Sequence, residues 1–203
     1  MTMRNADSNF YFDPVCPFAW MTSKWSRMMM VQEDYTVHWR FISLLTVNVS
    51  VDYGNHSPPG YDVRHTAGLM PLRVAARAEA EYGRESMGPP SVDRGAEIID
   101  TVGDEGRERG SRGFLEPILT EIGLSLELAV ALDDDFFDAE VTRKIHESLS
   151  LTGMDVGTPM IHFQAPDGVE LFGPMISRVP SQADAGRWWD NVVGLASFPV
   201  SPS

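Results

Sequence analysis

The residue best suited to covalent chemistry is Cys16, the only cysteine among the 203 residues. It follows the aromatic run Phe10–Phe12 and directly precedes Pro17. Proline is favoured at the first position of a helix, because its missing amide hydrogen is not needed there. The sulfur is therefore expected at a helix N-terminus, where unpaired amide hydrogens and the helix dipole stabilise a thiolate. A lone cysteine is more often a small buried side chain, but this position favours a reactive nucleophile.

A second candidate element lies far along the chain, at Gly157, Thr158 and Pro159. These residues directly precede an apolar segment that is predicted to be a strand. An X-Pro bond at the start of a strand can be cis, and such a loop would matter if it lay beside Cys16. An ordinary proline at the first residue of a strand explains the pattern equally well. Spacing alone does not choose between these two interpretations.

Two groups of elements would position these candidates. Hydrophobic periodicity and turn residues predict a strand, a helix and a strand at the beginning of the chain, and two strands and a helix at its end. Their predicted bounds are Asn9–Phe12, Phe18–Val31, Tyr35–Leu45, Met160–Phe163, Val169–Phe172 and Ser181–Ala196. This order, β-α-β followed by β-β-α, is the layout of a thioredoxin fold.

The intervening segment is expected to be helical. Its predicted helices span 64–82, 91–102, 114–122, 124–132 and 135–149, and Asp133 or Asp134 could cap the last of them. We therefore predict an α/β thioredoxin fold with an inserted all-helical domain. The thioredoxin-like domain would comprise residues 1–50 and 154–203, and the insertion residues 51–153.

Composition excludes several classes of function. A formal net charge of −13 argues against nucleic-acid binding, which needs a concentrated basic surface. No apolar run reaches the roughly 18 residues of a membrane span, and the N-terminal segment does not have the pattern of a secretory signal. The five histidines lack metal-ligand spacing, so no metal site is expected. A single cysteine fits the cytoplasm, because it cannot form an internal disulfide.

The segment from Phe10 to Trp20, Phe-Tyr-Phe-Asp-Pro-Val-Cys-Pro-Phe-Ala-Trp, resembles the active-site segment of the DsbA-like thioredoxin family. The segment from Val156 to His162 is similar to its cis-proline loop. Within that family the chain looks most like the actinobacterial mycothiol-dependent nitroreductases, which share a Gly-Pro-x-x-Ser-Arg element such as Gly173–Arg178. More distantly it resembles kappa-class glutathione transferases and 2-hydroxychromene-2-carboxylate isomerases.

The resemblance implies a cytoplasmic oxidoreductase that exchanges electrons with a low-molecular-weight thiol, mycothiol or a similar one, and binds no tight cofactor. Cys16 would be the nucleophile, and Thr158 and Pro159 would form the cis-proline loop beside it. The residues expected to bind the substrate or the thiol are Pro17, Phe18, Ala19, Asn48 and Tyr61. The implied partners are this small thiol and an electrophilic or disulfide substrate, and a homodimer is an open alternative to a monomer.

Ala19 is the main departure from this branch, which usually has a second cysteine at that position. Without a second thiol, Cys16 cannot close an internal disulfide, so a mixed disulfide must be resolved from outside. This predicts a monothiol mechanism. Two alternatives stay open: a kappa-like transferase or isomerase that binds the thiol without forming a disulfide, and a non-catalytic binding protein.

Overall fold

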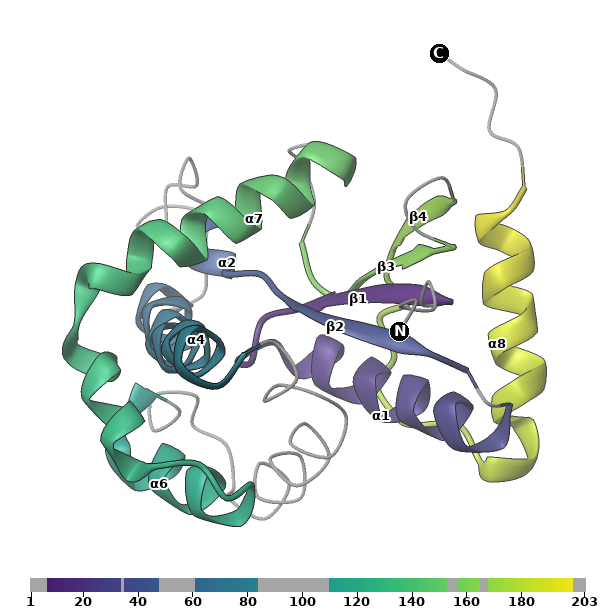
Figure 1. Ribbon diagram of the computed structural model, residues 1–203. Helices are drawn as coiled ribbons and strands as arrows, with labels where there is room; N and C mark the ends of the chain where they lie inside the picture. Colours follow the sequence, from purple (N-terminus) through teal and green to yellow (C-terminus); the bar gives the residue numbers. More distant parts are fainter. Residues whose placement is uncertain are drawn as a thin grey trace. The chain divides into compact units, whose positions relative to one another are not determined.

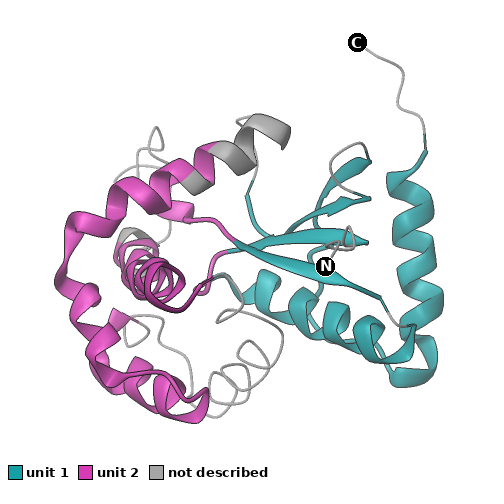
Figure 2. Cartoon of the chain, viewed as in Figure 1, with its two compact units in different colours: residues 1–12, 16–40, 156–203 teal, residues 13–15, 41–155 magenta. Residues whose placement is uncertain are grey.

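The computed structural model describes residues 7–33, 35–47, 61–83, 110–152, 157–164 and 168–198. The chain divides into two compact units (Figure 2). Unit 1 comprises Met1–Phe12, Cys16–Arg40 and Val156–Ser203, and unit 2 comprises Asp13–Val15 and Phe41–Asp155. The domain boundaries expected near residues 50 and 154 stay predictions.

Unit 1 contains a four-stranded sheet with the strand order β2-β1-β3-β4 (Figure 1). Its strands are β1 (Ser8–Phe12), β2 (Val37–Phe41), β3 (Met160–Phe163) and β4 (Val169–Phe172). The pairs β1–β3 and β3–β4 are both antiparallel, so Phe10 lies opposite Ile161, which lies opposite Leu171. Every residue of β1 and β3, the two central strands of this sheet, is buried.

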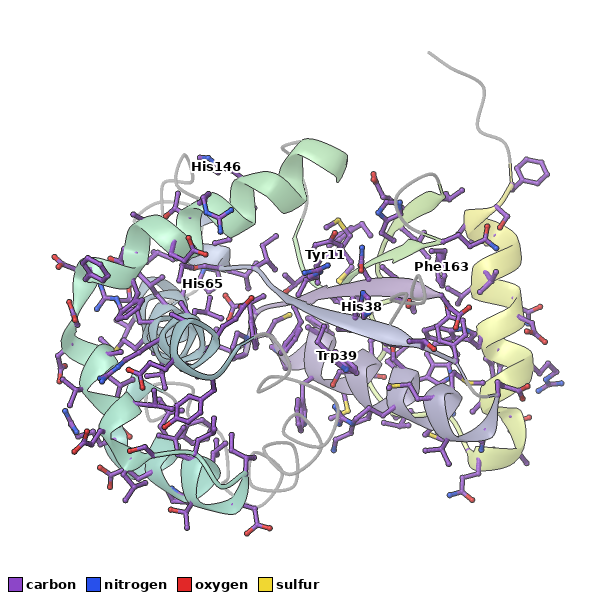
Figure 3. The ribbon with its side chains drawn as sticks, in the orientation of Figure 1. Tyr11, His38, Trp39, His65, His146 and Phe163 are labelled. Carbon is purple, nitrogen blue, oxygen red and sulfur yellow. The ribbon has the colours of Figure 1, made fainter. Side chains whose placement is uncertain are left out.

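Two helices of unit 1 pack on the same face of this sheet. They are α1 (Pro17–Gln32) and α8 (Gln182–Ala196). Trp189 of α8 makes edge-to-face contacts with Trp25 of α1 and Phe163 of β3, at centroid distances of 5.3 and 6.0 Å. Phe163 accordingly points toward α8 in Figure 3. The order β1-α1-β2 and β3-β4-α8, in this sheet, confirms the predicted α/β thioredoxin fold.

Trp189 is a buried side chain that contacts both α1 and β3. It is 3% exposed and also contacts the ring of Tyr35, whose pKa is raised by burial. We expect Trp189→Ala to lower the free energy of unfolding by about 3–5 kcal/mol, the usual cost of removing a buried tryptophan. Its neighbour Trp188 is 50% exposed and provides a matched control. Chemical denaturation that showed equal losses for Trp189→Ala and Trp188→Ala would contradict this assignment.

Unit 2 is helical in its described part. Its elements are α2 (Leu44–Val47), α4 (Tyr61–Tyr82), α6 (Arg112–Glu121), η3 (Leu126–Asp133), η4 (Asp135–Phe137) and α7 (Asp138–Thr152). Apolar side chains of α4, α6 and η3 form its core: Val74, Ala78, Phe114, Leu115, Leu119, Leu128, Ala129, Ala131 and Leu132. Arg73 joins α4 to α7 through two hydrogen bonds to Asp138, which raise the pKa of its guanidinium.

Three predicted elements need correction. The strand expected over Tyr35–Leu45 ends at Phe41, because the amide of Leu44 donates to a buried carboxylate and begins a short helix. The helix expected over 124–132 is a 3-10 helix that begins at Leu126. The last insertion helix begins at Asp138, because Asp134 caps the separate turn η4 by accepting from the amide of Phe136. The helix expected over 91–102 lies outside the described residues.

Candidate active site

The Cys16 side chain caps the N-terminus of α1. Its backbone is extended (φ −79°, ψ 114°), and its sulfur accepts a hydrogen bond from the amide of Ala19 at 3.4 Å. Pro17 stands at the first helical position, as the sequence predicts. Because the first amides of a helix have no partner within it, the sulfur satisfies one of them, and a negative charge there is favoured. The structure therefore places the Cys16 sulfur at the N-cap of α1.

The same sulfur is in contact with the loop before β3. The Cys16 thiol donates to the backbone carbonyl of Thr158 at 3.3 Å, across 142 residues of sequence. The Thr158–Pro159 peptide bond is cis. Both residues are buried, and among the described residues the Thr158 hydroxyl has no hydrogen-bond partner. The structure therefore brings together Cys16, Thr158 and Pro159, the three residues expected to be catalytic.

A third segment, which was not among the predicted site residues, contacts this loop. The amide of Gly173 donates to the carbonyl of Pro159 at 2.8 Å. The next residue, Pro174, accepts from the hydroxyl of Thr22 in α1 at 2.7 Å. Thr22 itself is fully buried, and the hydrogen bond is partly buried. The signal available in the sequence was the Gly173-Pro174 pair directly after a strand, but its partner 152 residues away could not be identified from spacing.

The other predicted site residues differ in their placement. Pro17 and Phe18 are exposed next to Cys16, and Phe18 retains 45% of its accessible surface. Ala19 is fully buried, so its contribution to the site is the amide that contacts the sulfur. Tyr61 is the first residue of α4 in unit 2, and its role beside Cys16 stays a prediction. Asn48 lies outside the described residues.

The histidines are placed in separate elements. His38 lies on β2, His65 on α4 and His146 on α7 (Figure 3), while His162 is buried on β3. The Nδ1 atom of His162 is 3.9 Å from a carboxylate oxygen of Glu170 on the neighbouring strand. Within the described ranges, no three histidine, cysteine or acidic side chains are grouped so that they could hold a metal ion.

This arrangement gives a thiol two different hydrogen-bond partners. In the protonated state the sulfur donates to the Thr158 carbonyl, and in both states it can accept from the Ala19 amide. The first bond favours the thiol and the second favours a charged sulfur, because hydrogen bonds to a charged acceptor are stronger than neutral ones. The site therefore offers a sulfur atom one backbone donor, the Ala19 amide, and one backbone acceptor, the Thr158 carbonyl.

Comparison with known proteins shows the family of this chain. Residues 15–201 match the model of the Rv2466c-like family, described as the mycothiol-dependent nitroreductase Rv2466c. The chain belongs to this family. The match includes Cys16, both loops that surround it and α8, so the resemblance to mycothiol-dependent nitroreductases is confirmed over nearly the whole chain.

Two further similarities accompany the Rv2466c-like match. An uncharacterised protein of Mycobacterium tuberculosis, Rv2286c, is 29% identical over 195 residues, which are 94% of this chain and 77% of that protein. A solved structure of a 2-hydroxychromene-2-carboxylate isomerase aligns with a TM-score of 0.47 and 14% identity, covering 93% of this chain and 95% of the other. Among the described residues of this family member, no helix combines the length and apolarity needed to cross a bilayer.

Proposed function

We propose that this chain is a cytoplasmic thiol-dependent oxidoreductase that acts through Cys16 and an external low-molecular-weight thiol, with mycothiol as the best candidate. The observation that carries the proposal is the position of the Cys16 sulfur, 3.4 Å from the Ala19 amide at the start of α1 and 3.3 Å from the Thr158 carbonyl. Membership in a family of mycothiol-dependent nitroreductases supports the choice of thiol. The electrons come from thiols, so the reaction needs no tightly bound cofactor.

The proposed reaction consists of two thiol–disulfide exchanges. The Cys16 thiolate attacks one sulfur of a disulfide substrate, which forms a mixed disulfide and releases the other half as a thiolate. A second small thiolate then attacks the substrate sulfur of this mixed disulfide. Cys16 returns as a thiolate, and the small thiol is oxidised to a disulfide with the bound half. The second step must come from outside, because the chain has no other cysteine.

Mass spectrometry of the intact protein tests this reaction. Incubation with the disulfide of mycothiol is expected to add the mass of one mycothiol to the protein, and added mycothiol should remove it again. Protein alkylated beforehand with iodoacetamide is the control and should gain nothing. An unmodified mass after incubation of the untreated protein would contradict the proposed function.

One observation favours a second candidate, a kappa-like transferase or isomerase. Cys16 is only 5% exposed, and both of its hydrogen bonds could equally be made by a hydroxyl group that holds the thiol of a bound co-substrate. Such an enzyme would use the helix N-terminus to stabilise the thiolate of its co-substrate and would form no disulfide with the protein. Substitutions at Cys16 separate the two candidates.

The proposed function also needs residues that bind the substrate and the small thiol. The exposed ring of Phe18 lies two residues from the nucleophile and offers an apolar contact for the substrate. Asn48 and Tyr61 are proposed as further binding residues on the basis of the family resemblance. A non-catalytic binding protein would show no adduct on Cys16 in the mass measurement, and a homodimer stays an open prediction.

A further inference from the structure

The buried carboxylate of Asp13 fixes the turn that leads to Cys16. Asp13 is 1% exposed and lies three residues before the nucleophile. Its Oδ1 accepts from the amide of Val15 at 2.9 Å, and its Oδ2 accepts from the amide of Leu44 at 2.7 Å. Hydrogen bonds to a carboxylate are roughly twice as strong as neutral ones. The carboxylate therefore fixes the conformation of residues 13–15 and attaches this turn to the start of α2.

Gly68 of α4 lies directly against this carboxylate. A Cβ atom added to Gly68 of α4 would lie 2.8 Å from Oδ1 of Asp13 and 2.9 Å from a methyl carbon of Val15. Both distances are shorter than van der Waals contact, so any side chain at position 68 requires the Asp13 carboxylate and the Val15 side chain to shift. Gly68, Asp13, Val15 and Leu44 all belong to unit 2. Position 68 thus offers a second, independent way to disturb the same carboxylate.

We propose that Asp13 is a positioning residue for Cys16, an inference that rests on the proposed role of Cys16 as the nucleophile. Val15 is joined to Cys16 by a peptide bond, so the turn held by Asp13 determines the direction in which the chain enters Cys16. Cys16 must be extended at this point to place its sulfur on the Ala19 amide. A displaced turn moves the sulfur away from this amide and removes a hydrogen bond that stabilises the thiolate.

A positioning role and a purely electrostatic role of Asp13 predict different reaction rates of Cys16 in two variants. Asp13→Asn keeps the size of the side chain but presents an NH2 group to one of the two amide donors, so the turn loses a hydrogen bond. Gly68→Ala keeps the charge and displaces the carboxylate. If Asp13 acted only through its negative charge, Asp13→Asn would favour the Cys16 thiolate and accelerate its reactions, while Gly68→Ala would change little. If Asp13 positions Cys16, both substitutions slow the reactions of the Cys16 thiolate.

The test is the rate of Cys16 alkylation by iodoacetamide from about pH 5 to about pH 9, followed by intact mass on the folded protein. We expect both variants to react about tenfold more slowly at pH 7, the scale of one hydrogen bond to a charged group, with the half-maximal rate displaced to higher pH. Gly113→Ala is the matched control, because its added Cβ meets only the Ser111 hydroxyl at 3.9 Å. This control should react like the wild type.

The alkylation rates of the variants and of the wild type distinguish a failure of this inference from a failure of the proposed function. Unchanged or faster alkylation of folded Asp13→Asn overturns the positioning role of Asp13. A wild-type protein whose Cys16 does not react at pH 7 counts instead against the proposed nucleophile. Where Asp13→Asn does not fold, Gly68→Ala decides: a wild-type profile in that variant overturns the inference, and slower alkylation with a displaced profile supports it.

Discussion

Replacing Cys16 with serine is expected to reduce mycothiol-dependent disulfide reduction by at least about a thousandfold, because a hydroxyl cannot form the mixed disulfide on which the reaction depends. The substitution leaves the site otherwise intact. A serine oxygen can accept from the Ala19 amide and donate to the Thr158 carbonyl, as the sulfur does. Folding should therefore be unaffected, and the measurement is the steady-state rate of disulfide reduction with mycothiol in excess.

Comparison with Cys16→Ala distinguishes the oxidoreductase from the transferase. An alanine makes neither hydrogen bond, so it removes both the nucleophile and the group that could hold a co-substrate thiolate. The oxidoreductase loses its activity with either substitution. A kappa-like transferase would retain activity with serine and lose it with alanine, because it needs only the hydrogen bond. Substantial activity in Cys16→Ser would therefore overturn the monothiol mechanism and favour the transferase.

The local features of the site could be predicted from the sequence. A proline directly after Cys16 determines where α1 begins. The sulfur therefore lies at the helix N-terminus, and this placement does not depend on contacts with distant residues. The position of β3 could also be predicted locally, because its short apolar run directly follows Pro159. These predictions succeeded because each depends on residues within a few positions of one another.

The features that could not be predicted from the sequence depend on contacts between residues far apart along the chain. The bond from Thr22 to the Pro174 carbonyl joins residues 152 positions apart, and neither residue type indicates a partner. The strand expected to reach Leu45 ends at Phe41, because the amide of Leu44 is bound by Asp13, 31 residues earlier. Apolar residues such as Ile42 and Leu44 fit a strand and a buried helix start equally well. The hydrogen bond from the Leu44 amide to the buried Asp13 carboxylate favours the helix start.

Ala19 is the position at which a single substitution should change the mechanism. Its amide is 3.4 Å from the Cys16 sulfur, so a thiol introduced by Ala19→Cys would lie close to the mixed disulfide. That thiolate would attack the Cys16 sulfur, close an internal disulfide and release the bound small thiol as a thiolate. At about 1 mM external thiol, even a modest effective molarity of about 0.1 M would shorten the lifetime of the mixed disulfide on the order of 100-fold.

Ala19→Ser is the matched control for this experiment, because the side chain of Ala19 is fully buried and any added atom must be accommodated there. The lifetime is measured by acid quenching and intact mass after preparing the mycothiol adduct. Ala19→Cys should lose the adduct and be left two hydrogens lighter than the reduced variant, whereas Ala19→Ser should retain it like the wild type. An adduct equally long-lived in both variants would mean that the helix start holds the two sulfurs apart. In that case, the missing second cysteine would not explain why Cys16 depends on an external thiol.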